Sequence, residues 1–231
     1  VFGASFFLFP HPVRELAKVT HEVGAHVAFD GSHVLGLIAG GQFQDPLREG
    51  ASVLFGSTHK SFFGPQGGII VADREHEVIR RRIYPTFVDN AHWNRIAALT
   101  LALAEIKEFG KAYARQVVNN AQALAKALAD FKFPVMCPEL GFTRSHQVLL
   151  DFGGYRKSRV LAKRLEAANI IADCGVRLGV SEITRRGMKE KEMHRVAEFI
   201  KRVIKDGEKP KEVKPEVPKF AADFKKVKYC F

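Results

Sequence analysis

The sequence predicts an α/β fold in which a mostly parallel sheet is covered by helices. Short apolar segments alternate with amphipathic helical segments between residues 1 and 73, and long helical segments with a compact α+β pattern follow from residue 94. Parallel strands need long crossover connections, usually helices, so the alternation in the first part is typical of such a sheet. We expect two domains, with a boundary near residue 110.

Proline and glycine bound the elements of the first part. A helix is expected between the proline turn at 10–12 and Gly24, because apolar residues from Val13 to Val23 recur at helical spacing. Strands are expected at 26–30, 51–57 and 69–73, and a short helix at 33–41. Both faces of these strands are apolar, which favours central positions in the sheet.

The second part begins with helices. From Asn94 the sequence predicts two long helices, with Gly110 as a weak break between them. Downstream we expect a strand at 146–152, a helix at 158–168, a strand or turn at 175–180 and a closing helix. One apolar stripe marks that last helix: Met193, Val196, Ile200, Val203 and Ile204. After Asp206 the chain is rich in proline and charge, so residues 206–231 are expected to form an extended or loosely docked basic tail.

The composition excludes disordered and fibrous proteins. Of the 231 residues, 46% are hydrophobic and 26% are charged, as in globular proteins. No apolar run reaches the roughly 18 to 20 residues of a membrane-spanning helix, and no signal-peptide pattern is present, so we expect a cytoplasmic protein. Cys137, Cys174 and Cys230 lack paired or metal-ligand spacing, which favours reduced thiols and no metal site.

The net charge of +11 permits a polyanionic partner. Residues 201–231 hold ten basic and five acidic residues, so nearly half of the excess lies in the terminal stretch. A solvated tail explains that charge more simply than nucleic acid does. No arginine-rich helix, zinc-finger spacing or aromatic RNA-binding signature accompanies it, so nucleic acid is the less favoured partner.

Polar side chains cluster where the early strands are expected to end. Asp30 follows an apolar run and His33 comes three residues later, while Lys60 follows the next strand. Open α/β sheets bind their ligands at this edge. Taken singly, a lysine is usually a solvated surface residue and an aspartate at a strand end is often a helix cap.

Together, Asp30 and Lys60 suit pyridoxal phosphate. That cofactor needs a lysine amine to form a Schiff base and a carboxylate beside its pyridine nitrogen to keep the nitrogen protonated. A protonated ring is the better electron sink for a substrate carbanion. The spacing alone is suggestive and no more.

Three longer motifs make the family recognisable. AFDGSHVLGLIAGG at 28–41, GSTHKSFFGPQGG at 56–68 and GVRLGVSEITRRGM at 175–188 occur in the order found in serine hydroxymethyltransferase, a fold-type I pyridoxal phosphate enzyme. The chain resembles the archaeal branch of that family most. The resemblance implies that residues 1–110 are the second half of a large cofactor-binding domain with a mostly parallel sheet, and that residues 111–231 are a C-terminal α+β small domain.

The resemblance also assigns roles to single residues. Lys60 matches the lysine that binds the cofactor covalently, Asp30 matches the acid at the pyridine nitrogen, and His33 matches a histidine beside cofactor and substrate. Arg177 matches the arginine that holds the amino-acid carboxylate, a task that suits its paired donors. Further cofactor-binding positions are Ser5, Ser57 and His59, with Thr58 in the same hydroxyl run.

Structural alternatives remain open for several of these residues. His33 could be a packing or hydrogen-bonded histidine. The other polar residues could have the structural task of satisfying backbone groups; these are Ser5, Ser57, Thr58 and His59. Arg185 and Arg186 could be surface charge before the last helix, and His146 a core residue.

The implied reaction is serine to glycine conversion with one-carbon transfer to tetrahydrofolate or a modified pterin, in a homodimer. The alternatives are another fold-type I enzyme, such as a threonine aldolase or an aminotransferase, and a non-catalytic fragment or basic interaction module. Salt-sensitive polyanion binding would favour the last of these.

The sequence departs from the family pattern in two places. Gln66 replaces an arginine of the glycine turn, and residues 85–95 replace a glycine-rich segment that approaches the cofactor phosphate of a neighbouring subunit. Asn90 and His92 could act as donors there, or as a helix cap and its neighbour. The chain also opens within the large domain, without the family's phosphate-binding loop, ring-stacking residue and catalytic glutamate. We expect it to be part of a longer enzyme rather than a half-protein.

Overall fold

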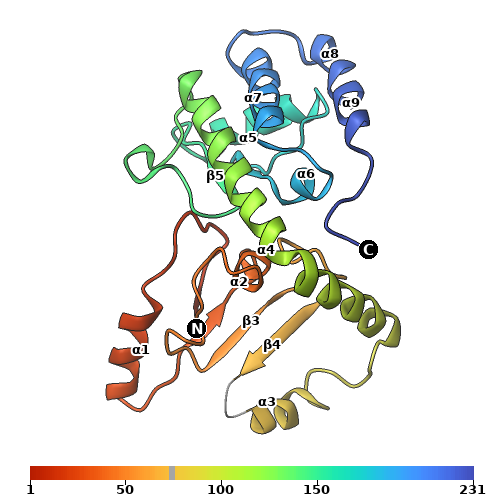
Figure 1. Ribbon diagram of the computed structural model, residues 1–231. Coiled ribbons are helices and arrows are strands. Elements are labelled where there is room, and N and C mark those ends of the chain that lie inside the picture. Colours follow the sequence, from red (N-terminus) through yellow and green to blue (C-terminus); the bar gives the residue numbers. More distant parts are fainter. Residues whose placement is uncertain (73–75) are drawn as a thin grey trace. The chain divides into compact units, whose positions relative to one another are not determined.

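A computed structural model describes residues 1–72 and 76–231 (Figure 1). The chain divides into two compact units. The first contains Val1–Ala114 together with Phe231, and the second contains Arg115–Cys230. The boundary between the units falls inside a helix, α4 (Trp93–Asp130).

A four-stranded sheet forms the centre of the first unit. Its strands are β1 (Phe2–Gly3), β2 (Ala28–Asp30), β3 (Val53–Ser57) and β4 (Gly68–Ala72), in the spatial order β1-β2-β3-β4. The first three run parallel, as the alternating pattern predicts, and β4 pairs antiparallel with β3 (Figure 1). Of the strand expected at 69–73, residue 73 lies outside the described residues.

The expectation that all these strands are central is wrong for β4. It is the last strand in the order of the described sheet and pairs only with β3 there. Ile70 is 46% exposed and Val71 is 40% exposed, although both were expected to be buried. β4 is only partly covered: Ile69 and Ala72 are half-buried, and Ile70 and Ala72 line a pocket with Ile79 and Ile83 of α3.

Helices α1 (Val13–Glu22), α2 (Leu35–Ala39) and α3 (His76–Ile83) complete the first unit before α4. Helix α1 buries Val13 and Ala17, as its spacing predicts, but Val23 lies beyond its end and is 77% exposed. Phe7, Phe29 and Leu37 are fully buried and form the centre of the core.

Helix α4 is a single helix where the sequence predicts two. It runs through Gly110, which was expected to break it. An interior glycine costs a helix only about 1 kcal/mol relative to alanine, too little to end one with a long apolar pattern on both sides. Gly40 also packs against the Gly110 carbonyl so closely that a β-carbon at position 40 would clash with it.

The second unit is built on a small antiparallel ladder. Strand β5 (Gln147–Leu149) pairs with β6 (Arg177–Gly179), with Leu149 opposite Arg177. After α4 and before the terminal stretch, the described helices of this unit are η1 (Pro138–Leu140), α5 (Tyr155–Glu166), α6 (Ser181–Arg185) and α7 (Glu190–Ile204). Met193, Ile200 and Val203 of the predicted stripe on α7 are buried, whereas Val196 and Ile204 are half-buried.

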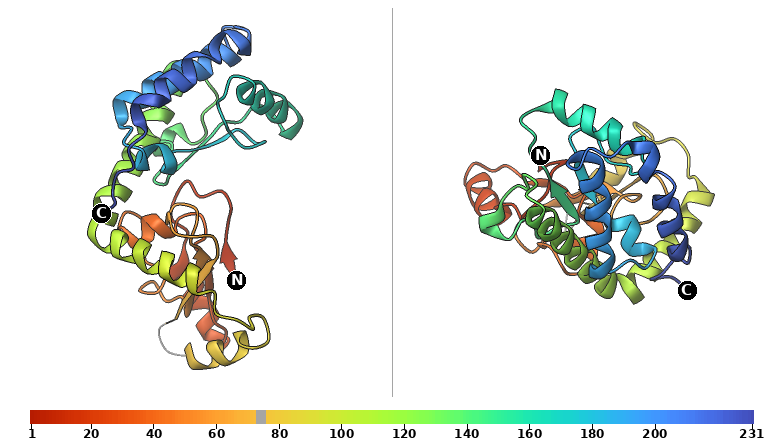
Figure 2. Two further views of the ribbon diagram at one scale, coloured as in Figure 1. Left: turned by 90° about the vertical axis from the view of Figure 1, so that its right-hand side faces the viewer. Right: turned by 90° about the horizontal axis from the view of Figure 1, so that it is seen from above.

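The terminal stretch is structured, which corrects the expectation of an extended or loosely docked tail. It forms α8 (Pro210–Val213), α9 (Glu216–Ala221) and η2 (Ala222–Phe224). The Arg202 guanidinium of α7 donates to Glu208 at 2.8 and 2.9 Å and to Glu216 at 2.7 and 2.9 Å. Helix α9 lies beside α7 (Figures 1 and 2), where the Phe199 and Phe220 rings meet edge to face. Charge in this tail therefore pairs with charge on α7.

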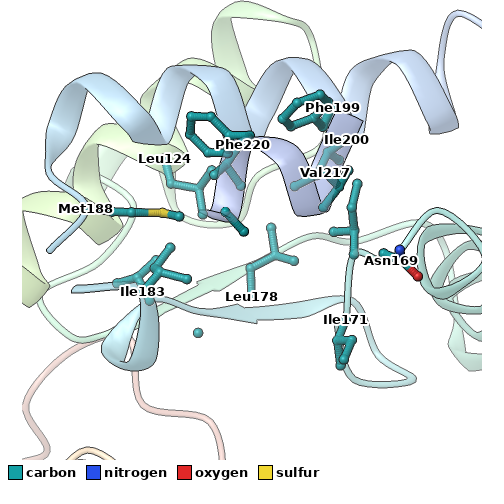
Figure 3. Close-up of a pocket in the computed structure, with 15 residues that line it drawn as sticks. Leu124, Asn169, Ile171, Leu178, Ile183, Met188, Phe199, Ile200, Val217 and Phe220 are labelled. Carbon is teal, nitrogen blue, oxygen red and sulfur yellow. The ribbon is translucent and has the colours of Figure 1, made fainter. Parts of the chain in front are cut away.

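An apolar pocket of about 210 Å³ lies between β6, α7 and α9 in the second unit. Leu178, Phe199 and Phe220 point into it (Figure 3). Asn169 supplies the one polar side chain among its described lining residues. The pocket therefore resembles a gap in a hydrophobic core more than a site with convergent polar groups.

Across the described ranges 1–72 and 76–231, no helix is both long and apolar enough to cross a membrane.

Candidate functional site

The carboxyl ends of the parallel strands bring three of the sequence-predicted residues to one edge of the sheet. Ser5 follows β1, Asp30 ends β2 and Ser57 ends β3. In the ladder, Gly3 is paired with Asp30, and Asp30 with Phe55. The residues that follow these strands therefore lie on the side where open α/β sheets hold ligands.

Asp30 is held by its own loop. Its Oδ1 accepts the backbone N–H of Ser32 at 2.9 Å, and the carboxyl group remains half-buried. The helix that follows begins at Leu35 and has no side-chain cap, so Asp30 does not cap it. A β-carbon at Gly3 would lie 2.6 Å from the Asp30 β-carbon, so the glycine lets β1 approach the acid.

The loops after β2 and β3 are joined by a hydrogen bond. The backbone N–H of Ser57 donates to the Ser32 hydroxyl at 3.2 Å. Ser57 thus lies beside the turn that carries Asp30 and His33. His33 is half-buried, between Asp30 and the start of α2. The structure brings the two sequence motifs together at this point.

Thr58 closes the loop that carries Lys60. Its side chain is fully buried, and its hydroxyl lies 2.6 Å from the Pro65 carbonyl and 3.1 Å from the Gly67 carbonyl. Its backbone N–H donates to Gly67, and its carbonyl accepts from Gly64 at 2.6 Å. This geometry supports the alternative that Thr58 satisfies backbone groups.

Lys60 itself is half-buried in this loop. His59, immediately before it, is exposed, and its Nδ1 lies 3.5 Å from the Gly67 backbone nitrogen as an acceptor. His59 and Lys60 are therefore both more exposed than the buried Thr58 that precedes them. The hydrogen-bonded turn formed by Thr58 and Gly67 fixes the backbone from which both side chains project.

Ser61 and its contacts were missed by the sequence analysis. Its hydroxyl accepts the Gly36 N–H at 3.1 Å, and its carbonyl accepts the Tyr113 hydroxyl at 3.0 Å. A β-carbon at Gly36 would overlap the Ser61 carbonyl. Helices α2 and α4 therefore clamp the residue after Lys60. Sequence spacing gave no signal of this, because Tyr113 lies 52 residues from Ser61.

Residues 85–95, which depart from the family pattern, line part of a surface pocket of about 570 Å³ in the first unit. It is lined by the glycine turn and by residues 87–92, including Asn90 and His92. Arg95, also missed, donates to the carbonyls of Gln66 and Gly68 and so fixes the turn. The His92 carbonyl accepts the Ile96 N–H at 3.0 Å, as expected of a residue at the start of α4. That contact supports the cap alternative for His92.

Arg177 belongs to the second unit, where it opens β6. Its Nε lies 2.8 Å from Oδ2 of Asp173. The guanidinium side chain is 23% exposed, and so remains accessible from solvent. His146, by contrast, is 6% exposed and its carbonyl accepts the Val180 N–H, a core environment.

Arg185 and Arg186 are tied to the terminal stretch. The Arg186 Nε donates to the Phe224 carbonyl at 2.9 Å, and the Arg185 carbonyl accepts from Lys228. The expectation of surface charge before the last helix holds only in part, because both arginines are half-buried and Arg186 contacts Phe224. Within the described ranges, no group of three or more His, Cys, Asp or Glu residues could hold a metal ion.

Comparison with known proteins decides the family. Residues 1–200 match the family model for serine hydroxymethyltransferase. The chain belongs to the serine hydroxymethyltransferase family.

Curated members of this family from archaea are close relatives. The serine hydroxymethyltransferase of Methanocella arvoryzae is 51% identical over 247 residues, which cover 100% of this chain, and that of Methanothermobacter thermautotrophicus is 49% identical over the same length. In both comparisons the chain spans 58% of the relative's length.

A solved structure has the same architecture. The crystal structure of L-threonine transaldolase from Pseudomonas fluorescens matches with a TM-score of 0.93 and 33% identity. The match covers 98% of this chain and 55% of the other. The α/β architecture is therefore shared with that enzyme.

Proposed function

We propose that this chain is part of a pyridoxal phosphate enzyme that converts serine to glycine and transfers the hydroxymethyl carbon to a tetrahydropterin such as tetrahydrofolate. Membership of the family supports the reaction class. The observation that carries the proposal is that Asp30 and the segments with Ser5 and Ser57 meet at one edge of the sheet. Lys60 follows Ser57 by three residues in the same loop.

The residues at this edge fit pyridoxal phosphate. The donor set contains one amine, one carboxylate and hydroxyls, which are the groups that the aldehyde, the pyridine nitrogen and the phenolic oxygen of that cofactor need. Gly3 and Gly56 let strands β1 and β3 pack closely against the loop of Asp30 and Ser32, because a β-carbon at either position would crowd that loop. When bound, the cofactor supplies an electron sink for the bond that breaks.

Each side chain then has one task. The Lys60 amine would hold the cofactor covalently, and the Asp30 carboxylate would keep the pyridine nitrogen protonated. Ser5, Ser57, His59 and His33 would bind or orient cofactor and substrate. Arg177 would bind the amino-acid carboxylate with its guanidinium fork.

The domain assignment belongs to the same proposal. Residues 1–110 would be the second half of a fold-type I large domain, and residues 111–231 the C-terminal small domain. The order of the three motifs supports this. The homodimer and the cytoplasmic location are also part of the proposal. Sedimentation of the purified protein tests the dimer, and its intact mass tests whether it exceeds 25.8 kDa.

A second candidate is an aldol-type enzyme that needs no pterin, because the matched solved structure is an L-threonine transaldolase. One assay separates the two. Glycine is measured from serine with and without tetrahydrofolate, and from threonine without it. We expect carrier-dependent glycine formation from serine. Carrier-independent cleavage of threonine with no activity on serine would replace the proposal with the second candidate.

A further inference from the structure

One carboxylate organises the loop that leads into Arg177. Asp173 precedes the arginine by four residues, and its Oδ1 accepts the backbone N–H groups of Gly175 and Arg177, each at 2.9 Å. Its Oδ2 lies 2.8 Å from Nε of the same arginine. A single side chain therefore holds both the backbone and the guanidinium of Arg177.

We propose that Asp173 is a positioning residue, which orients the Arg177 guanidinium for the carboxylate of the amino-acid substrate. This inference rests on the proposed function of Arg177. It adds a residue that none of the three family motifs contains, because the third motif begins at Gly175.

The geometry explains how the pairing would act. A guanidinium is planar, so a carboxylate bound at Nε fixes the plane in which the two Nη groups lie. The long arginine side chain would otherwise lose rotamer freedom when the substrate binds. An arginine ordered before binding loses less, which is the general advantage of preorganisation.

Asp151 offers a matched control in the same unit. Its Oδ1 accepts the backbone N–H of Gly153 at 2.8 Å, which reproduces the Asp173 to Gly175 bond. No ion pair to Asp151 is found among the described residues. An Asp→Asn change at either position keeps an oxygen acceptor for the backbone N–H. Only at position 173 does the change also remove a negative charge that is paired with an arginine.

The test measures binding of glycine, and of glycinamide, which has no carboxylate, to the holoenzyme by calorimetry. We expect Asp173→Asn to weaken glycine binding about tenfold, in the range of one charge-assisted hydrogen bond, and to leave glycinamide binding unchanged. In turnover, the KM for serine should rise by a similar factor while kcat stays within about twofold. Asp151→Asn should change none of these values.

Three results would overturn the inference. Unchanged glycine binding in Asp173→Asn would mean that the backbone bonds suffice. Tighter binding would mean that Asp173 competes with the substrate. Equal weakening of glycine and glycinamide binding would indicate general damage to the loop. Asp173→Ala, which also removes the backbone acceptor, is the comparison for such damage, and thermal unfolding of both variants checks that they fold.

Failure of the underlying proposal gives a different pattern. If Arg177→Ala leaves glycine binding unchanged, Arg177 does not hold the carboxylate, and the role of Asp173 falls with it. If Arg177→Ala weakens binding strongly, then Asp173→Asn added to it should have no further effect, because the aspartate acts through the arginine. A further additive loss in the double variant would contradict the inference alone.

Discussion

Lys60 in the first unit and Arg177 in the second are held by different kinds of interaction. The loop of Lys60 is fixed by neutral hydrogen bonds from Thr58 and Tyr113 to backbone carbonyls. The loop of Arg177 is fixed by a charged group, Asp173, through one ion pair and two backbone bonds. Neutral buried contacts change little with salt or mild acid, whereas exposed charged contacts respond to both.

The terminal stretch extends the same contrast. It is fastened to α7 by Arg202 through Glu208 and Glu216, and Arg195 also contacts Glu216 at 3.3 Å. Hydrogen bonds from Arg202 lower the pKa of both glutamates below the usual 4.5. The first unit thus relies on neutral hydrogen bonds around Lys60, and the second on charge around Arg177 and around its terminal stretch. The following experiments test that difference.

Lys60→Ala should have the largest effect. Without the amine, the purified protein should lose the visible absorbance band of covalently bound cofactor completely, because no other group forms the Schiff base. Absorbance spectroscopy with added pyridoxal phosphate measures this. Lys18→Ala, a change at an exposed position on α1, is the control. A normal band in Lys60→Ala would remove that lysine from its assigned role.

Thr58→Val should be next in size. The change keeps the shape of the side chain but removes its hydroxyl, so the half-buried Pro65 carbonyl loses this donor and the Gly67 carbonyl keeps only the Thr58 backbone N–H of the two that Thr58 supplies. Such a loss costs about 1–3 kcal/mol of unfolding free energy. Urea denaturation measures it, and Thr58→Ser should recover most of the stability. The loss should be the same in low and high salt, and a strong salt dependence would contradict the neutral character of this loop.

Tyr113→Phe should have a smaller effect of the same kind. It removes one hydroxyl that donates to Ser61 in a buried position. We expect a loss of about 0.5–1.5 kcal/mol of unfolding free energy, the net value of one neutral hydrogen bond. The affinity for pyridoxal phosphate, measured by titration, should fall modestly because Ser61 follows Lys60. Unchanged stability and affinity would show that the clamp from α4 does not act on the lysine loop.

Arg202→Gln should have the smallest effect and the clearest pH signature. The lowered pKa values of Glu208 and Glu216 mean that their pairing stabilises the folded state above about pH 4.5 and is lost as the pH falls through the folded-state values. Arg202→Gln should therefore lower the thermal midpoint at pH 7, and the difference from the parent protein should shrink as the pH falls below 4.5. Thermal unfolding across this range measures the difference, and parallel curves at all pH values would contradict it.

Much of the first unit could be predicted from the sequence, because local patterns determine it. The strands that end at Asp30 and Ser57 are short apolar runs bounded by turn residues, and the motif around Lys60 is contiguous. The exposure of β4 could not be predicted, since its residues are as apolar as those of a buried strand. Only the position of a strand in the sheet determines whether its faces are covered.

The second unit was harder to predict because its decisive contacts join residues that no periodicity relates. Arg202 pairs with Glu208 and Glu216 only because the chain reverses after α7. The proline and charge of that stretch are also typical of a solvated tail. Asp173 was overlooked for a similar reason: its bond to Arg177 depends on the loop turning back.

The close packing of Gly36 against Ser61 has a consequence for any survey of tolerated substitutions. A side chain at position 36 would displace the Ser61 carbonyl, and with it the backbone next to Lys60. We expect position 36 to reject every other amino acid, although it belongs to α2 and carries no functional side chain. A map of intolerant positions would therefore include the residues that support the Lys60 loop as well as those proposed to bind the cofactor.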